Sequence, residues 1–191
     1  MQKFTILGIT LYDYGAREAL RNTDRFLGSG GLNTVAYISS AQIAQASRDV
    51  ELKESVEQLD MTLCTEPDLL EAAGIAARSR IREIDEKVYL RELLRKLYRN
   101  RNSVYLLADT QQELEMLEDL IQEYQGNLYI QGRGTCEMFD RQPERLVNEL
   151  NDVAPDAVLS RMPWPQDIVL MKEYGQYVNA RLWVSLPYGA V

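Results

Sequence analysis

The sequence predicts an α/β protein in which helices flank a mostly parallel sheet. From residue 102 to residue 184, short apolar runs alternate with helix-like segments of about 10–15 residues, the length that connects parallel strands. The chain has 191 residues, of which 46% are hydrophobic and 26% charged, as in an ordinary globular protein. This length fits one domain rather than several, so we expect residues 1–191 to form a single α/β domain.

In the first half of the chain, runs of β-branched and apolar residues predict the strands. These runs lie at residues 4–9, 34–38 and 59–63. Apolar residues at helical spacing predict a helix over residues 16–27. The glycine-rich residues 28–31 end that helix, because glycine favours turns over helix interiors.

Two more helices in this half are predicted from residues that favour helix starts. Ser39 and Gln42 resemble a capping box, which predicts a helix through residue 46. Pro67 would lie in the first turn of a helix, where proline is tolerated, so we predict a helix over residues 66–78. Between this helix and the next, residues 79–87 are expected to form a mobile loop.

The second half has clearer patterns. Apolar runs predict strands at residues 104–108, 127–131, 157–159 and 181–184. Leucines along one side predict a helix over residues 89–98, and Thr110 with Glu113 forms a capping box for a helix through residue 124. Further helices are expected at residues 143–153 and 166–174. Strands separated by helices of this length indicate βαβ units, and therefore a Rossmann-like sheet.

Composition and charge exclude several function classes. The chain has no histidine, which excludes Ser-His and Cys-His nucleophile pairs, His-ligated metals and His general bases. A net charge of −8 and a pI near 4.7 argue against nucleic-acid binding. Residues 78–101 contain nine basic and four acidic residues, so this segment carries +5 and the remainder −13. This basic segment is compatible with a binding site for an anion or with contact to an anionic membrane surface. No metal or other cofactor is expected.

The sequence gives no signal for export or for a membrane span. No apolar run approaches the roughly 20 residues that cross a bilayer. The N-terminus turns polar too early for a signal peptide. We therefore expect a cytoplasmic protein with at most peripheral membrane contact, in which Cys64 and Cys136 stay reduced.

Polar residues follow several of the predicted strands. In parallel sheets, ligands bind beyond the carboxyl ends of the strands, where the helix N-termini point. The candidate pocket is therefore formed by residues 39–40, 64–66, 108–110, 132–134 and 161–167.

Several motifs in a fixed order resemble one known family. The segments that carry the resemblance are SSAQIAQASRDVELKESVEQLD, VYLLADTQQELEMLEDLIQEY, NLYIQGRGTCEMF and ERLVNELNDVAPDAVLSRMPWPQD. Residues 150–156 match the family's Asn to Pro-Asp run, and Gln166 with Asp167 matches its Gln-Glu pair. Across nearly its whole length the chain resembles the WecG/TagA/CpsF family of bacterial glycosyltransferases (glycosyltransferase family 26).

The resemblance implies a function and also shows what this chain lacks. Family members move an N-acetylmannosamine-type sugar from a UDP donor to a lipid-linked acceptor at the inner membrane face. Their general base is an Asp after the third strand, where this chain has Thr65 or Glu66. The family's Gly-Gly turn is replaced by Ala108 and Asp109, and a carboxylate there is expected to oppose UDP binding. The resemblance also implies that the family's C-terminal appendage is missing.

Two hypotheses follow from these differences. In the first, the chain is a catalytically degenerate relative that acts as a binding or partner subunit in cell-envelope polysaccharide synthesis, with a protein partner such as an intact homologue. In the second, it is an active transferase that uses a UDP-sugar and a lipid-linked acceptor. Its base is then Thr65, Glu66 or Asp68, and Arg133 or the Arg91 helix face holds phosphate. Neither hypothesis excludes a homo-oligomer.

Each candidate site residue also has a structural explanation. The candidates for a nucleotide-sugar pocket are Ser40, Asp109, Gly132, Arg133, Gln166 and Asp167. Glu66 and Asp68 form a carboxylate pair or simply place negative charge at a helix N-terminus. Asp109 is an acid or a turn residue before a helix cap. The Gly132 to Gly134 segment holds a phosphate through its backbone N–H groups and one guanidinium, or is a plain turn.

Three other features stand out. Arginines recur every four residues at Arg91, Arg95 and Arg99, which predicts a face for an anionic lipid phosphate or a merely solvated face. Cys136 is a nucleophile only if a positive partner lies near it. Trp164 lies between two prolines and, if exposed, would anchor a protein partner.

Overall fold

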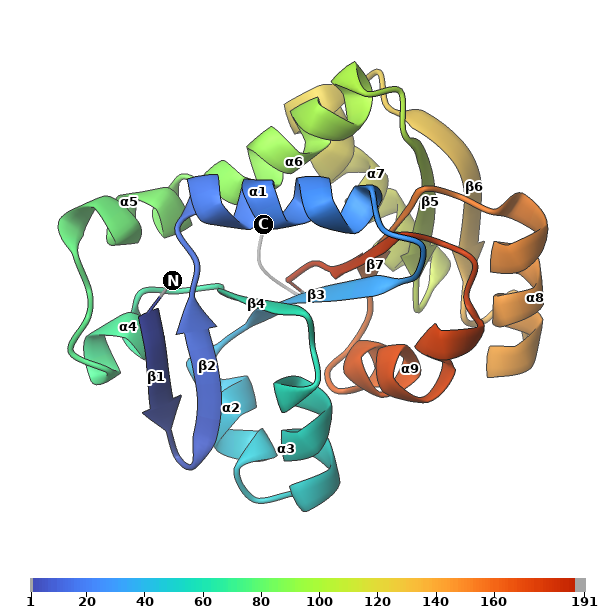
Figure 1. Ribbon diagram of the computed structural model, residues 1–191. Helices are drawn as coiled ribbons and strands as arrows, with labels where there is room; N and C mark the ends of the chain where they lie inside the picture. Colours follow the sequence, from blue (N-terminus) through green and yellow to red (C-terminus); the bar gives the residue numbers. More distant parts are fainter. Residues whose placement is uncertain (1, 188–191) are drawn as a thin grey trace.

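The computed structural model describes residues 2–187 and confirms the predicted α/β fold class (Figure 1). Its central sheet has the strand order β4-β3-β8-β7-β5-β6, and all neighbouring strands are parallel. The strands are β3 (Asn33–Ile38), β4 (Met61–Cys64), β5 (Ser103–Ala108), β6 (Tyr129–Thr135), β7 (Ala157–Arg161) and β8 (Leu182–Ser185). The strand expected at residues 127–131 thus begins later and runs further than its apolar residues suggest.

Helices cover both faces of this sheet (Figure 1). One layer contains α1 (Ala16–Leu27), α6 (Val88–Arg99) and α7 (Gln111–Gln125). The other contains α2 (Ser40–Ala46), α3 (Val50–Glu57), α4 (Asp68–Ala72), α8 (Pro143–Val153) and α9 (Gln166–Tyr174), which the short 3₁₀ helix η1 (Gly175–Tyr177) follows. The helices expected at residues 16–27, 143–153 and 166–174 are confirmed.

The sheet separates two hydrophobic cores. Side chains of a strand alternate between its two faces, and in β5 this sends Leu106 into the core under α1, α6 and α7. Tyr105 and Leu107 enter the opposite core, under α8 and α9. Both faces of β5 are therefore buried, which explains why its sequence is a continuous apolar run.

The N-terminal strand prediction is wrong, because the chain forms a hairpin there. The strands β1 (Gln2–Ile6) and β2 (Ile9–Asp13) pair antiparallel. Leu7 and Gly8 form the turn with φ of 51° and 78°, a left-handed conformation that glycine adopts easily. Phe4, Ile9 and Leu11 bury the hairpin against the core that contains α2 and α3.

The region between β4 and α6 also differs from the prediction. The helix expected over residues 66–78 is the short α4, which ends before Gly74 at a φ of 69°. Residues 79–87, expected to be a mobile loop, lie mostly in helix α5 (Arg78–Asp85). This helix fully buries none of its residues and has only Ile81 and Ile84 as apolar side chains, too few for a clear helical pattern in the sequence. Helix α3, which starts at the Asp49 cap, was not expected either.

The helix caps show the same mixture of confirmed and corrected predictions. Both hydrogen bonds of the Ser39–Gln42 capping box are present, each from the backbone N–H of one residue to the side chain of the other. Thr110 caps α7 by accepting a hydrogen bond from the Glu113 backbone. The Glu113 side chain, however, pairs with Arg161 at 2.9 Å instead of returning to the cap.

The helices after β5 and β7 leave the sheet toward opposite faces. Helix α7 follows β5 and buries Leu114 and Leu117 under α6, whereas α9 follows β7 and buries Ile168 and Met171 in the other core. The two strands are direct neighbours. In open α/β sheets a crevice forms beyond the carboxyl ends of such a strand pair, and ligands bind there.

Glycines in β6 make room for a tyrosine on the neighbouring strand. Gly132 and Gly134 lie inside β6, so the turn expected over residues 132–134 is wrong. Gly132 pairs with Tyr105 across the strands, and a Cβ at Gly132 would lie 2.6 Å from the Tyr105 ring. These glycines therefore serve packing of the sheet.

We expect Gly132→Ala to destabilise the protein by about 1–3 kcal/mol, because the new methyl group overlaps the Tyr105 ring. Gly30→Ala is the matched control, since nothing lies within 4 Å of its added Cβ, and its effect should stay within about 0.5 kcal/mol. Urea unfolding of the two variants measures both values. Equal stabilities would show that β6 tolerates a side chain facing Tyr105.

Candidate functional site

Two adjoining cavities lie at the carboxyl ends of the sheet strands. The first, which we call the tyrosine cavity, measures about 180 Å³ and is lined by Tyr14, Tyr37, Tyr89, Cys64, Arg80 and Lys87, among others. The second, the carboxylate cavity, measures about 210 Å³, and its lining includes Ser39, Gln42, Glu66, Trp164, Asp167 and Ser185. Tyr37, Thr65 and Pro187 line both. The two cavities are therefore neighbouring compartments of one site.

Helix α5 closes the tyrosine cavity on one side through ion pairs. Arg80 binds Asp13 of the hairpin at 2.6 Å, donates to the Tyr14 carbonyl at 2.8 Å and also pairs with Glu83. Glu83 accepts a hydrogen bond from the Ala16 backbone at 3.0 Å and so satisfies the N-terminus of α1. These charged contacts hold α5 in place without buried apolar side chains.

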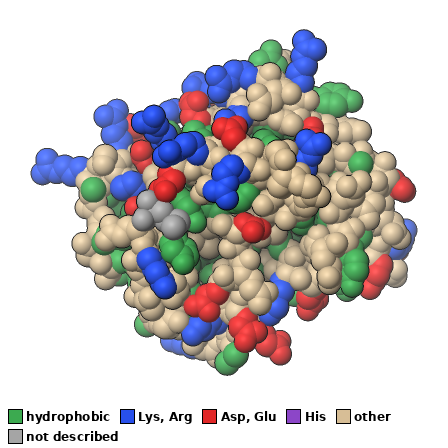
Figure 2. Space-filling model, in the orientation of Figure 1, with side chains coloured by type: hydrophobic (Ala, Val, Ile, Leu, Met, Phe, Trp, Pro, Cys, Tyr) green, Lys and Arg blue, Asp and Glu red, His purple; other side chains and the backbone are tan. Residues whose placement is uncertain are grey.

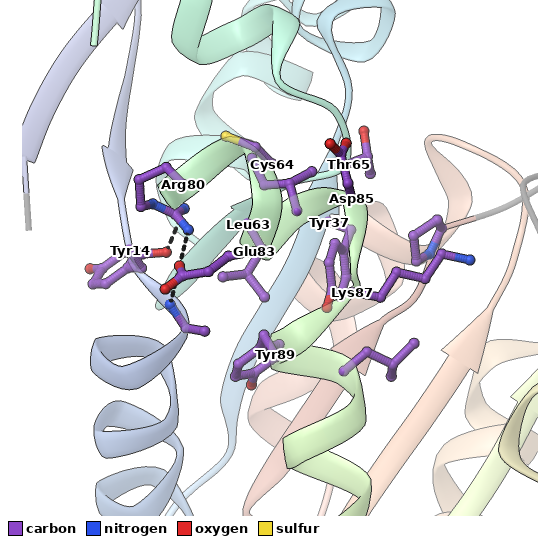
Figure 3. A pocket seen from close by; sticks show the side chains of 14 residues that line it. Tyr14, Tyr37, Leu63, Cys64, Thr65, Arg80, Glu83, Asp85, Lys87 and Tyr89 are labelled. Carbon is purple, nitrogen blue, oxygen red and sulfur yellow. Dashed lines mark hydrogen bonds and ion pairs between the residues drawn. The ribbon is translucent and has the colours of Figure 1, made fainter. Parts of the chain in front are cut away.

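The opposite side of the tyrosine cavity carries Lys87. In the view of Figure 3, Tyr37 lies between the Arg80–Glu83 pair and Lys87. Among the described residues that line this cavity, Arg80 is fully engaged in ion pairs, whereas no ion pair is seen for Lys87. Lys87 is therefore the cation that this compartment offers to an anionic ligand.

Two of the three tyrosines that line this cavity, Tyr37 and Tyr89, are neutral at physiological pH. Burial raises the pKa of both Tyr37 and Tyr89. The Tyr89 hydroxyl forms a hydrogen bond with Thr23 at 2.9 Å, and the centroids of the two rings lie 6.3 Å apart. They form an apolar wall with polar tips rather than acid–base groups.

Neither cysteine is activated as a nucleophile. Burial raises the pKa of Cys64 to about 12 and that of Cys136 to about 11. Both thiols are free, and both stay protonated at neutral pH. Nucleophilic catalysis through Cys136, considered above, has no support in this geometry.

The residues at the expected base position are both engaged. Thr65 donates its hydroxyl to the Ile38 carbonyl at 3.3 Å. Glu66 accepts the Ser40 backbone N–H at 2.8 Å and the Ser40 hydroxyl at 2.6 Å. Glu66 therefore binds the N-terminus of α2, where negative charge is stabilised. Asp68 is exposed on α4 and is not among the residues that line either cavity.

Asp167 is the buried carboxyl group of the carboxylate cavity. Asp167 lies in the first turn of α9 and is only 2% exposed. Trp183 donates its indole N–H to the Ser160 hydroxyl at 2.8 Å, and Ser160 donates to Asp167 Oδ2 at 2.7 Å. Burial raises the pKa of Asp167 to about 6, while the surrounding donors limit the rise. Asp167 is thus a carboxyl group that titrates close to neutral pH.

The charge of Asp109 is compensated. Arg141 donates to Asp109 at 2.5 Å, and Gln166 reaches the same carboxylate at 3.4 Å. The sequence predicted a carboxylate that opposes binding of a diphosphate, and the ion pair with Arg141 offsets the charge on which that prediction depended. Arg141 lies 32 residues further along the chain, in the loop before α8, so nothing in the local sequence around Asp109 indicates it.

A second ion pair is buried at the same crevice. Arg161 ends β7, is 1% exposed and contacts Glu113 of α7 at 2.9 Å. Within the described part of the chain, its two terminal guanidinium nitrogens have no hydrogen-bond partner. Glu113 is therefore the carboxylate that compensates a cation held between the sheet and α7.

The remaining predicted residues lie apart from the cavities. Arg133 projects from β6 and pairs with Glu118, so it does not reach them. Trp164 is partly buried, packs against the core and lines the carboxylate cavity, so the condition of exposure set for a surface anchor is not met. It is a wall of the site and not a surface anchor.

The predicted arginine face lies on the outer side of α6. Arg95 pairs with Glu92 at 2.7 Å, Arg91 lies 3.7 Å from the same carboxylate, and Arg99 is exposed. Figure 2 shows further basic side chains gathered over α1, α5 and α6. The face is therefore broader than one helix, and part of its charge is compensated locally.

Sequence reasoning found several residues of the site and missed others. Glu66, Gln166 and Asp167 were expected and lie at the strand ends. Tyr37 and Lys87 were not assigned to the site, although Tyr37 is next to last in its strand, a position that points to the carboxyl edge. Lys87 could not be placed, because α5 was expected to be a loop.

Comparison with known families places the chain in one of them. The model of the glycosyl transferase WecG/TagA/CpsF family matches residues 4–190. No curated protein matches the chain. Within residues 2–187, no helix is both long and apolar enough to cross a membrane.

We expect Glu113→Gln to lower the free energy of unfolding by about 3–5 kcal/mol, because it leaves the buried Arg161 guanidinium without a counter-ion. Glu123→Gln on the same helix changes an exposed carboxylate and should cost less than about 0.5 kcal/mol. Chemical denaturation of both variants measures the difference. A loss for Glu113→Gln as small as that of the control would contradict a stabilising role for this pair.

A pH-dependent stability follows from Asp167. Its folded-state pKa of about 6 lies above its ordinary value of 3.8, so the folded protein binds this proton more tightly than the unfolded chain. The resulting stabilisation is complete below about pH 4 and is lost as the pH rises through about 6. Asp167→Asn should therefore have a free energy of unfolding higher than that of the natural chain by about 3 kcal/mol at pH 8, but not at pH 4, as measured by urea unfolding. The same difference at both pH values would rule out this linkage.

Proposed function

Because the chain belongs to the WecG/TagA/CpsF family of glycosyl transferases, we propose that it binds a glycosyl ligand in its two cavities without transferring it. In this proposal the protein is a catalytically degenerate family member. It acts as a binding or partner subunit in the synthesis of bacterial cell-envelope polysaccharide.

The main support is the state of the expected base position. Thr65 is a hydroxyl donor, and Glu66 is held by two hydrogen bonds at the N-terminus of α2. A general base must reach the proton of the acceptor hydroxyl with a free lone pair, and its loss costs about 10²–10⁴ in rate. Neither residue is placed as a free base, which supports binding without the family's transfer step.

The charges of the cavities support weak binding of a diphosphate. Arg80 is committed to Asp13 and Glu83. This leaves Lys87 as the available cation among the described lining residues of the tyrosine cavity. One ammonium group on a mostly apolar wall is a poor cradle for two phosphates, which usually bind several N–H groups or an Arg fork. We therefore still expect UDP-sugars to bind weakly. The reason is the single available cation, Lys87, and no longer repulsion by the Asp109 carboxylate.

The proposed setting is the cytoplasmic side of the inner membrane, with peripheral contact only. Basic side chains over α1, α5 and α6 support contact with an anionic surface (Figure 2). Arg91, Arg95 and Arg99 belong to this face. A protein partner, such as an intact homologue that supplies the catalytic base, completes the proposal.

An active transferase is the second candidate function. One observation favours it: the carboxylate cavity contains two carboxyl groups, Glu66 and Asp167. Of these, Asp167 has a pKa near neutral, as a general base requires. In that case the chain would use rearranged residues on the family's scaffold.

Titration with UDP and a transfer assay test the proposal. We expect a Kd for UDP no tighter than about 0.1 mM by calorimetry, because Lys87 provides a single cation. Lys87→Met should remove the residual binding, whereas Lys3→Met, which changes an exposed lysine of the hairpin, should leave it unchanged.

The transfer assay uses UDP-N-acetylmannosamine and a lipid-linked acceptor. We expect no product above the level without protein. Micromolar binding of UDP, or product that depends on the protein, would support the active transferase instead.

A further inference from the structure

Two polar groups of the carboxylate cavity lack partners. Ser160 donates to Asp167 Oδ2, and the Ser185 side chain lowers the pKa of the same carboxyl group by hydrogen bonding, whereas Asp167 Oδ1 has no partner of good geometry within the described residues. The indole N–H of Trp164 also has none there. Both residues line the same cavity. Buried polar groups without partners are uncommon in native proteins, and each one calls for an explanation such as a ligand.

Several other polar groups of this cavity are bound within the protein. Ser39 and Gln42 bind each other in the α2 cap, and Glu66 binds Ser40. Among the fully buried polar side-chain atoms that line this compartment, two have no partner within the described residues. One is an acceptor, Asp167 Oδ1, and the other is a donor, Trp164 Nε1.

The charge of the cavity selects against anions. Among its described lining residues, Glu66 and Asp167 are the charged groups, and none is Lys or Arg. A phosphate or carboxylate would be repelled there, because like charges at short range in a buried site are costly. An uncharged ligand that both donates and accepts hydrogen bonds fits instead, and sugar hydroxyl and N-acetyl groups have this property.

We propose that Asp167 and Trp164 are the ligand-binding residues of the carboxylate cavity, and that they bind an uncharged sugar ring. Asp167 Oδ1 accepts a hydroxyl proton of the sugar, and Trp164 Nε1 donates to an oxygen of the same sugar. The Trp183–Ser160–Asp167 chain of hydrogen bonds fixes the carboxylate so that Oδ1 stays available. This inference rests on the proposed function and adds which part of the ligand binds in which compartment.

The experiment measures binding of free sugars and of UDP separately. The probes are N-acetylmannosamine and N-acetylglucosamine, with Kd on the order of 1 mM expected for the natural chain. Saturation-transfer NMR follows the sugars, and tryptophan fluorescence reports on the cavity. Asp167→Asn should weaken sugar binding about 10-fold, because the bond to a charged acceptor is lost.

Two further variants make the test specific. Trp164→Phe keeps the ring and removes the N–H, and should weaken sugar binding about 5-fold. It decides the question if Asp167→Asn does not fold. Asp152→Asn changes an exposed carboxylate on α8 and should leave sugar binding unchanged. UDP binding should be the same in all three variants, because the proposed contacts concern the sugar alone.

The outcomes separate this inference from the proposed function. Sugar binding that is unchanged in both Asp167→Asn and Trp164→Phe overturns the inference and leaves the proposed function intact. A natural chain that binds neither sugar overturns both. Sugar transfer by the natural chain overturns the noncatalytic function, while weaker sugar binding in the variants still supports the inference.

Discussion

A parallel sheet buried on both faces leaves only one place for polar chemistry, the edge where its strands end. Strands β7 and β8 are buried along their whole length between two helical layers, and β5 is buried after its first residue. A charged side chain inside those layers would lose its hydration, and Arg161 is tolerated because Glu113 accompanies it. At the carboxyl edge, in contrast, helix N-termini and loop side chains can satisfy polar groups. Both cavities lie at this edge.

The groups at this edge differ in whether the protein itself satisfies them. Glu66 binds the N-terminus of α2, Asp109 binds Arg141, and Arg80 binds the hairpin and α5. These contacts support the fold and remove the groups from chemistry. Asp167 and Trp164 keep open positions, and Lys87 keeps an uncompensated charge in the described structure. In the proposed function, the satisfied groups support the fold and the open groups bind the ligand.

The two cavities also divide a ligand by its chemistry. Tyrosine rings and Lys87 line one compartment, whereas carboxyl groups and small polar side chains line the other. Tyr37 and Thr65 form the wall between them. An uncharged ring fits the second compartment, and an apolar or anionic portion fits the first. This division of the lining is the basis on which we propose a glycosyl ligand.

The sequence by itself determined the sheet, most helices and the edge that carries the site, because apolar periodicity and capping residues act over a few neighbouring positions. Ser39 with Gln42 is one such local signal, and the apolar run of β5 is another. Only the tertiary structure decided which polar groups are free. Helix α5 is held by ion pairs of Arg80 and Glu83 to the hairpin and α1, and the partner of Asp109 comes from a loop 32 residues away. Two charges pair only if they lie close together in space. For residues far apart in the sequence, the fold decides that distance, and local sequence patterns do not reveal it.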